Sequence, residues 1–140
     1  MAIVSETAVS LRITGDDLNP DEVTGLLGAT PSSAAQKSGV WHTPRGKSMP
    51  ARTGFWLLSA EHEKPGNFDL QIKRILDRLT GDLAIWADLS KRFQTELFCG
   101  AFMHNANEGT GLSAGTILAM AERGLRFELD LYAILEDDDD

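Results

Sequence analysis

The sequence is poor in the groups on which several classes of protein depend. It has one cysteine, Cys99, so no disulfide can form within the chain. A lone thiol in an apolar run is typical of a small buried hydrophobic residue. No apolar run approaches the roughly 18 residues that a membrane-spanning helix needs. The N-terminus has no basic segment followed by an apolar core, so we expect no signal peptide. These absences favour a domain of the reducing cytoplasm with no membrane partner.

Positive charge is also scarce. The chain has 13 Lys and Arg against 21 Asp and Glu, a net charge of −8. Affinity for phosphate backbones comes from cations, so this balance argues against nucleic acid as a partner. Residues 136–140 are a run of acids that repel one another and stay solvated. A chain of 140 residues is about one domain, and we expect a single domain over residues 1–135 followed by this acidic tail.

Motifs of known chemistry are missing as well. The histidines are His42, His62 and His104, and none has the spacing of a metal-ligand pair. There is no Gly-x-Ser-x-Gly elbow. The Gly-rich stretch at 109–115 lacks the Lys-Ser/Thr ending of a phosphate-binding loop. We therefore expect no metal, no cofactor and no assigned catalytic residue.

Hydrophobic periodicity predicts four strands, at residues 9–14, 54–59, 95–103 and 127–133. Between them it predicts a helix at 20–27, a helix at 114–123, and either two helices or one bent helix between 68 and 93. This order indicates an α+β fold, with one mainly antiparallel sheet of four strands or more and helices packed on one face. A ferredoxin-like arrangement is consistent with the same order.

Polar residues mark where these helices begin. Asn19, Asn67 and Ser113 each precede an apolar stripe and are good N-caps. Glu22 stands three positions after the first cap, where its side chain can bond back to the cap amide. Ile117 stands where a staple residue would pack against the residue before the cap Ser113.

Asp16 and Asp17 are adjacent acids in the turn between the first strand and the first helix. One reading is a metal or acid–base site, in which two carboxylates share a cation or a proton and His104 contributes. Adjacent residues of an extended stretch point in opposite directions, however. The other reading, which we favour, is a backbone joint whose carboxylates satisfy turn amides and the positive end of the helix.

The segment at residues 29–53 is the most informative feature. It carries Lys37, Arg45, Lys47 and Arg52 and no acid, whereas the rest of the chain sums to −12. Trp41 and His42 lie among these cations. Loops of this length are uncommon unless they are functional or disordered. A Trp beside Arg is a frequent composition of interface anchors. The alternative is a solvated loop whose cations rest against the protein's own acids.

Three phrases together resemble a bacterial family known as domain of unknown function 4279. They are ITGDDLNPDEVTGLLG (13–28), RTGFWLLSAE (52–61) and GLSAGTILAMAERGLRFELDLYAIL (111–135). The resemblance implies a small bacterial cytoplasmic α+β domain of about this length, with no established activity and no catalytic residues to carry over. Some such domains accompany toxins as immunity proteins. Phe55 departs from the pattern, because a less bulky residue is expected before Trp56.

Three functions follow as hypotheses. The first is a non-catalytic binding module that grips an acidic protein partner or a small anion through Trp41, His42, Arg45, Lys47 and Arg52, with an immunity-type role as one version. The second is a metal-dependent or acid–base hydrolase that uses Asp16, Asp17 and His104. The third is a structural homodimer, for which an apolar sheet edge or face would suffice.

Overall fold

The computed structural model describes residues 2–133, and the expected acidic tail at 136–140 lies outside this range. The helices are α1 (Pro20–Leu27), α2 (Phe68–Leu76), α3 (Leu83–Arg92) and α4 (Ala114–Glu122). The strands are β1 (Ala2–Ile3), β2 (Glu6–Gly15), β3 (Ser33–Ala35), β4 (Val40–His42), β5 (Ser48–Pro50), β6 (Gly54–Ser59), β7 (Gln94–Phe102), β8 (Glu108–Gly109) and β9 (Arg126–Tyr132). None of the described helices has the length and apolar character to cross a membrane.

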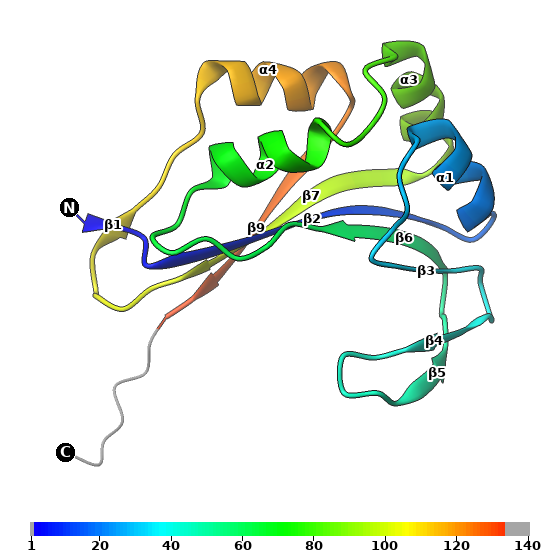
Figure 1. The fold of residues 1–140 in the computed structure, drawn as a ribbon, viewed down its shortest axis with the longest axis horizontal. Helices are drawn as coiled ribbons and strands as arrows, with labels where there is room; N and C mark the ends of the chain where they lie inside the picture. Colours follow the sequence, from blue (N-terminus) through cyan, green and yellow to red (C-terminus); the bar gives the residue numbers. More distant parts are fainter. Residues whose placement is uncertain (1, 134–140) are drawn as a thin grey trace.

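The main sheet has five strands in the order β3-β6-β2-β7-β9 (Figure 1). Every neighbouring pair is antiparallel except β7 and β9, which are parallel. The expected α+β class with one mainly antiparallel sheet is confirmed. The ferredoxin-like version is not confirmed. Among the four longer strands of the sheet, β2, β6, β7 and β9, the helices α2 and α3 both stand between the second and the third, where a ferredoxin-like fold has no helix.

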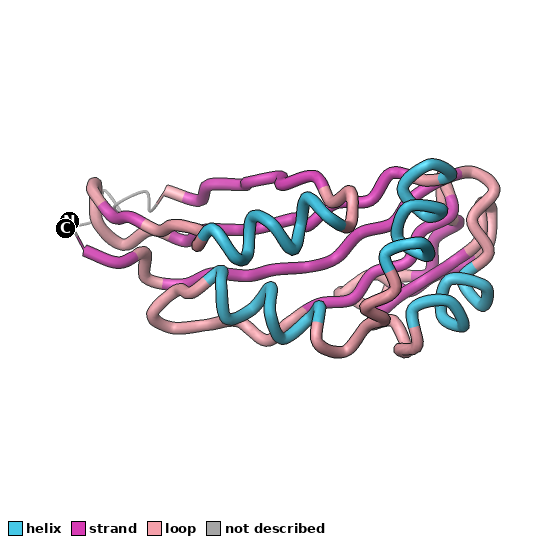
Figure 2. Tube along the Cα trace, turned by 90° about the horizontal axis from the view of Figure 1, so that it is seen from above, coloured by secondary structure: helices cyan, strands magenta, loops and turns pink. Residues whose placement is uncertain are grey.

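All four helices lie on one side of the main sheet, as the two perpendicular views show (Figures 1 and 2). The residues of β2 alternate between the two sides, so Val9, Leu11 and Ile13 are buried beneath the helices. Trp56 on β6 and Leu97 on β7 lie opposite Ile13 and Leu11 in the same core. This core fixes which side chains remain on the other side of the sheet.

We call that other side, which no described helix covers, the bare face. Its side chains are Glu6, Ala8, Ser10, Arg12 and Thr14 of β2, Phe55, Leu57 and Ser59 of β6, Glu96, Phe98 and Phe102 of β7, and Glu128, Asp130 and Tyr132 of β9. An antiparallel sheet commonly turns one polar face to water. Here that face carries several aromatic side chains, which is unusual for a merely solvated surface.

The predicted caps begin three helices. The side chain of Asn19 accepts from the amide of Asp21 at 3.0 Å, that of Asn67 from Leu70 at 3.0 Å, and that of Ser113 from Thr116 at 3.2 Å. The expected return bond from Glu22 to its cap is wrong. Its carboxylate instead pairs with Arg92 on α3 at 2.6 Å, a partner 70 residues away.

A buried polar pair joins β2 to α2. The hydroxyl of Thr7 donates to Gln71 Oε1 at 2.6 Å, and Gln71 Nε2 donates to the carbonyls of Thr7 and Glu61 at 2.9 and 2.8 Å. Both side chains are fully buried. Because each buried polar atom has a partner, the pair fixes α2 on the sheet without an unsatisfied group.

Candidate functional site

The segment at 29–53 is not a structureless loop. Its first part forms β3, which pairs with β6 at the edge of the main sheet, and its second part forms the β4–β5 hairpin. We call residues 36–53 the arm. Figure 1 shows the hairpin of the arm standing away from the sheet on the side opposite the helices. The expected loop is therefore corrected to a short edge strand and a projecting hairpin.

The tip of the hairpin has the turn residues that its geometry requires. Pro44 and Gly46 occupy the second and fourth positions of a tight turn, where a type I turn favours Pro and Gly. The amide of Gly46 donates to the carbonyl of Thr43 at 2.7 Å, and Gly46 has φ +79°, a left-handed conformation that glycine adopts without strain. The turn holds Arg45 and Lys47 at the outer end of the arm, both exposed.

Asp16 ties down the base of the arm. Its carboxylate accepts from the hydroxyl of Thr53 at 2.9 Å and pairs with Lys37 at 3.2 Å, so it contacts both ends of the arm. The hydrogen bond from Thr53 and then the charge of Lys37 lower the pKa of Asp16 below its ordinary value. Asp17 is exposed and forms no ion pair or side-chain hydrogen bond within residues 2–133. Only one of the two adjacent acids therefore has a structural partner.

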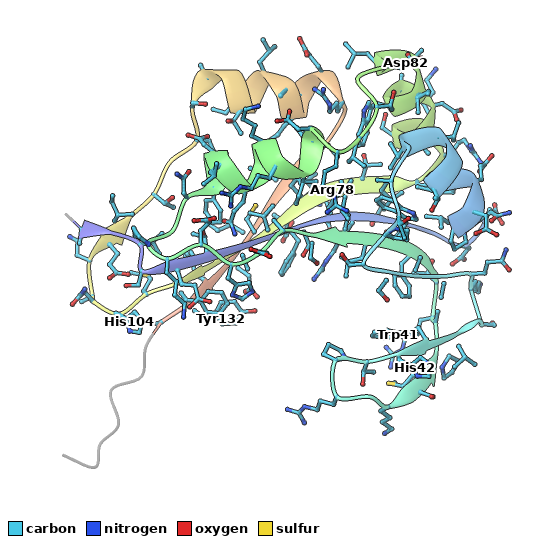
Figure 3. All side chains as sticks on the ribbon, viewed as in Figure 1. Trp41, His42, Arg78, Asp82, His104 and Tyr132 are labelled. Atoms are coloured by element: carbon cyan, nitrogen blue, oxygen red, sulfur yellow. The ribbon has the colours of Figure 1, made fainter. Side chains whose placement is uncertain are left out.

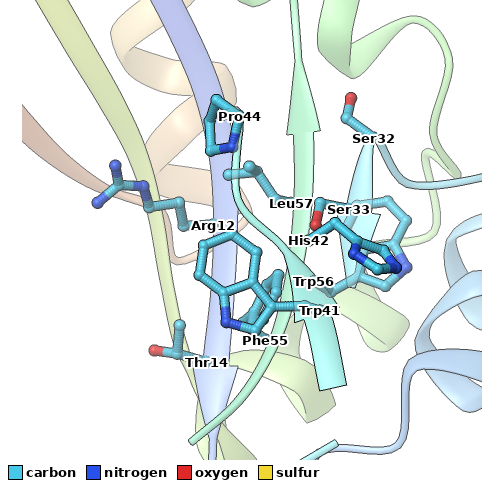
Figure 4. Close-up of a pocket in the computed structure, with 10 residues that line it drawn as sticks. All are labelled: Arg12, Thr14, Ser32, Ser33, Trp41, His42, Pro44, Phe55, Trp56 and Leu57. Carbon is cyan, nitrogen blue, oxygen red and sulfur yellow. The ribbon is translucent and has the colours of Figure 1, made fainter. Parts of the chain in front are cut away.

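The arm and the bare face enclose an open cleft of about 520 Å³ (Figure 4). Its lining residues are Arg12 and Thr14 of β2, Ser32 and Ser33, Trp41, His42 and Pro44 of the arm, and Phe55, Trp56 and Leu57 of β6. The indole of Trp41 meets Phe55 edge-on, with ring centroids 5.4 Å apart and planes at 76°. This contact holds the arm against the sheet and leaves Trp41 half-buried in the wall of the cleft.

Arg12 supplies a cation beside the floor of the cleft. Its guanidinium carbon lies 3.7 Å above the centroid of the Phe98 ring, so the group rests against that ring. Within residues 2–133 Arg12 forms no ion pair, although Glu96 lies opposite it in the strand register. Its N–H donors therefore remain open to a ligand on the bare face.

The cations of the arm divide into two kinds. Lys37 rests against Asp16, as the solvated-loop alternative expects. Arg45, Lys47 and Arg52 form no ion pair with any other residue in the described range, and all three are exposed. Most of the arm's positive charge is thus directed at solvent rather than at the protein's own acids.

His42 is the remaining predicted arm residue. It lies in β4 on the wall of the cleft, and its Nδ1 is 3.1 Å from the hydroxyl of Ser48 on β5. Trp41 and His42 therefore reach the same cleft from neighbouring positions (Figure 4). The structure brings these two together, while Arg45 and Lys47 stand farther out along the hairpin and Arg52 near its base.

His104 lies far from the two acids. Asp16 follows the end of β2, whereas His104 follows β7 beyond Phe102, which pairs with Glu6 at the start of β2. The length of β2 therefore separates them, roughly 30 Å at the usual rise of a strand. Figure 3 shows His104 at the end of the sheet opposite the hairpin that bears Trp41 and His42. Within residues 2–133, no three His, Cys, Asp or Glu side chains gather as a metal-ligand group.

An aromatic stack occupies the far end of the bare face. The rings of Phe102 and Tyr132 are stacked with centroids 4.6 Å apart, and His62 lies on Phe102 at 5.9 Å. Hydrogen bonding to Asp130 raises the pKa of Tyr132. With Phe98 in between, aromatic side chains run along the bare face from the cleft to this stack.

Sequence reasoning missed Arg12 and Phe55 as parts of the site. The alternation of β2 places Arg12 on the wet side of the strand, which was a usable signal. Phe55 stood out as bulkier than expected, and the structure gives a physical role to that bulk, since its ring carries Trp41. Neither signal could identify the arm as the partner of Phe55, because Trp41 lies on a different strand, β4, and meets Phe55 only in the folded chain.

Comparison with known proteins adds a family but no activity. Neither a comparison with curated proteins nor one with solved structures gives a match. The family described as domain of unknown function (DUF4279) matches residues 5–134, nearly the whole chain, which confirms the resemblance found in the sequence. The chain therefore belongs to the family of the domain of unknown function DUF4279.

Proposed function

We propose that this protein is a non-catalytic binding module of the bacterial cytoplasm, and that its cleft and arm bind an acidic segment of a partner protein. The observation that carries the proposal is the cleft itself, in which the half-buried Trp41 and the cation Arg12 flank an apolar floor. Trp and Arg are the side chains that most often dominate binding energy at interfaces. An immunity-type role, with a toxin as the partner, is one version of this proposal.

The charge distribution supports an acidic partner in spite of the net charge of −8. The arm holds four cations and no acid, and its hairpin stands away from the rest of the protein (Figure 1). At physiological ionic strength charges are screened over about 8 Å. An approaching segment would therefore meet Arg45 and Lys47 before it met the acids of the helical side, and this attraction would speed the encounter.

The shape of the site supports a protein segment over a small anion. The exposed cations do not converge on one point, because Arg45 and Lys47 lie in the turn between β4 and β5 whereas Arg52 follows β5 at the base of the hairpin. The cleft between them and the sheet is lined mainly by aromatic and aliphatic side chains. An extended segment with one large apolar residue in the cleft and acids on either side would use both features.

The test uses a synthetic peptide in which Phe is flanked by Asp and Glu, with a matched peptide in which Asn and Gln replace the acids. Binding is followed by acrylamide quenching of tryptophan fluorescence, because Trp41 is half-buried whereas Trp56 and Trp86 are fully buried. We expect the acidic peptide to bind saturably, to protect Trp41 from the quencher and to bind more weakly as salt is raised.

Matched variants locate the binding. Reversing both charges in Arg45→Glu/Lys47→Glu should weaken binding about tenfold or more, because like charges would then face each other. The control is Arg78→Glu/Lys91→Glu, which makes the same change in total charge at exposed positions of the helical side. Equal weakening by the two variants, or equal affinity for the acidic and neutral peptides, would refute the proposal. Thermal unfolding of each variant checks that the fold is retained.

A further inference from the structure

Exposed apolar side chains are concentrated at one edge of the protein. Ten large hydrophobic residues are exposed within the described range, and six of them lie on α4 and β9. Five of the six share the helical side of that edge, with exposures between 37% and 62%, and we call them the lateral patch: Ile117, Leu118, Phe127, Leu129 and Leu131. The largest apolar patch on the surface of a monomeric protein is often functional.

The β9 half of the patch belongs to the core side of the sheet. Phe127, Leu129 and Leu131 pair in register with the buried residues of β7, so they point toward the helices. No described helix covers them fully. In addition, β9 is the last strand of the sheet and has no partner on its outer side within residues 2–133. The strand has no Pro or Lys, and its three charged residues, Arg126, Glu128 and Asp130, all lie on the bare face.

The α4 half of the lateral patch is exposed on the same side of the sheet as the β9 half. Thr116 and Ala119 line the groove between α4 and α2. At about 100° per residue, Ile117 and Leu118 then lie on the side of α4 turned away from α2. Ile117, the expected staple residue, is 53% exposed. Because α4 runs through a short turn directly into β9, the helix and the strand lie next to each other at this edge of the sheet (Figures 1 and 2).

We propose that the lateral patch is a homodimer interface, in which β9 of one copy pairs antiparallel with β9 of a second copy and the two α4 helices pack above the joined sheets. The size of the patch fits this occupant. The exposed parts of its five side chains together equal about two and a half whole large side chains. This is on the order of 400–500 Å² of apolar surface. A standard interface buries about 800 Å² per partner, somewhat more than half of it apolar.

Among the registers that pair at least five residues of β9, the charges on the bare face favour one. To keep apolar rows together, the pairing can shift only by two residues at a time. With Glu128 on the two-fold axis, Phe127 of one copy faces Leu129 of the other, and Arg126 faces Asp130 twice. The single like-charge contact is between the two Glu128 side chains. Each of these carboxylates is already paired with Arg126 of its own strand at 3.0 Å. With Leu129 on the axis, by contrast, Glu128 would face Asp130 twice.

The proposal is independent of the peptide-binding function and is tested separately. Sedimentation equilibrium between about 1 and 100 µM, the range of moderate affinities, should show a dimer for the full chain. The variant Ile117→Glu/Leu131→Glu should be monomeric. Both positions are more than half exposed, so the fold should survive, and circular dichroism checks it. Leu83→Glu, an exposed apolar position on α3, is the control and should remain dimeric.

Crosslinking tests the register. A residue on the two-fold axis of an antiparallel pair lies ~4.5–5.5 Å from its copy, within the reach of a disulfide. Glu128→Cys should therefore form a disulfide-linked dimer in air. Glu61→Cys, at an exposed position that follows β6 and lies away from β9, should not. The native Cys99 is buried and should not contribute. A monomeric wild type, or a dimer that persists in Ile117→Glu/Leu131→Glu, would overturn the proposed interface.

Discussion

The contact between Trp41 and Phe55 is the point at which the arm is held to the sheet, and it can be measured. Both side chains are half-buried, so Trp41→Ala and Phe55→Ala should each cost about 1–2 kcal/mol, less than the removal of a fully buried aromatic residue. The edge-on pair, with centroids 5.4 Å apart, adds a coupling of about 0.5–1.5 kcal/mol beyond the area buried.

A double-mutant cycle isolates that coupling. The free energy of unfolding in urea is measured for the wild type, the two single variants and Trp41→Ala/Phe55→Ala. We expect the double variant to be less destabilised than the sum of the singles by the coupling energy. A coupling below about 0.3 kcal/mol, within the usual error of additivity, would mean that the arm does not rest on the sheet in solution. The cleft would then have no wall, and the basis of the proposed function would be lost.

The remaining predictions concern the body of the fold. Gln71→Leu should lower the free energy of unfolding by about 1–3 kcal/mol, because it leaves the buried Thr7 hydroxyl without its acceptor and removes the side-chain donor to the carbonyls of Thr7 and Glu61, while Gln94→Leu at an exposed position should change little in the same urea titration. Glu108 loses some hydration on folding, but its hydrogen bonds outweigh this loss and lower its pKa to about 2. Because that folded-state pKa lies below the unfolded value, the stability it contributes is present above about pH 4.5 and is lost as the pH falls toward 2, and Glu108→Gln should flatten this part of the acid-unfolding curve. Burial raises the pKa of the Cys99 thiol to about 12, so a thiol reagent should label it only when the protein unfolds, and rapid labelling under native conditions would contradict its burial.

The sequence predicted the main strands and helices because their signals are local. Alternation over β2 separates Leu11 from Arg12 within one strand. Asn19, Asn67 and Ser113 each cap a helix through an amide two or three residues away. Such contacts need no knowledge of the rest of the chain, so period and composition are sufficient to find them.

The parts that the sequence did not predict depend on distant partners. β3, β4 and β5 are each three residues long, too short for a periodic pattern. The two partners of Asp16 lie 21 and 37 residues away. Strand order follows from contacts across the sheet, and this order decides that Asp16 and His104 stand at opposite ends. The candidate cleft therefore became visible only when the arm and the bare face were placed in space.

The arm can vary with little effect on the core, and this separation suits it to carry the proposed binding surface. Apart from Ala51, every residue of the arm lies outside the buried hydrophobic set. The arm is joined to the sheet by Asp16 at its base and by one aromatic pair along its length. Substitutions at its exposed cations should thus change recognition while the free energy of unfolding stays nearly constant.

Substitutions in the lateral patch should change assembly in the same independent way, because the patch lies at the opposite edge of the five-stranded sheet. A variant with both Arg45→Glu/Lys47→Glu and Ile117→Glu/Leu131→Glu should therefore show the sum of the two effects, and strong non-additivity would show that the two surfaces communicate through the sheet.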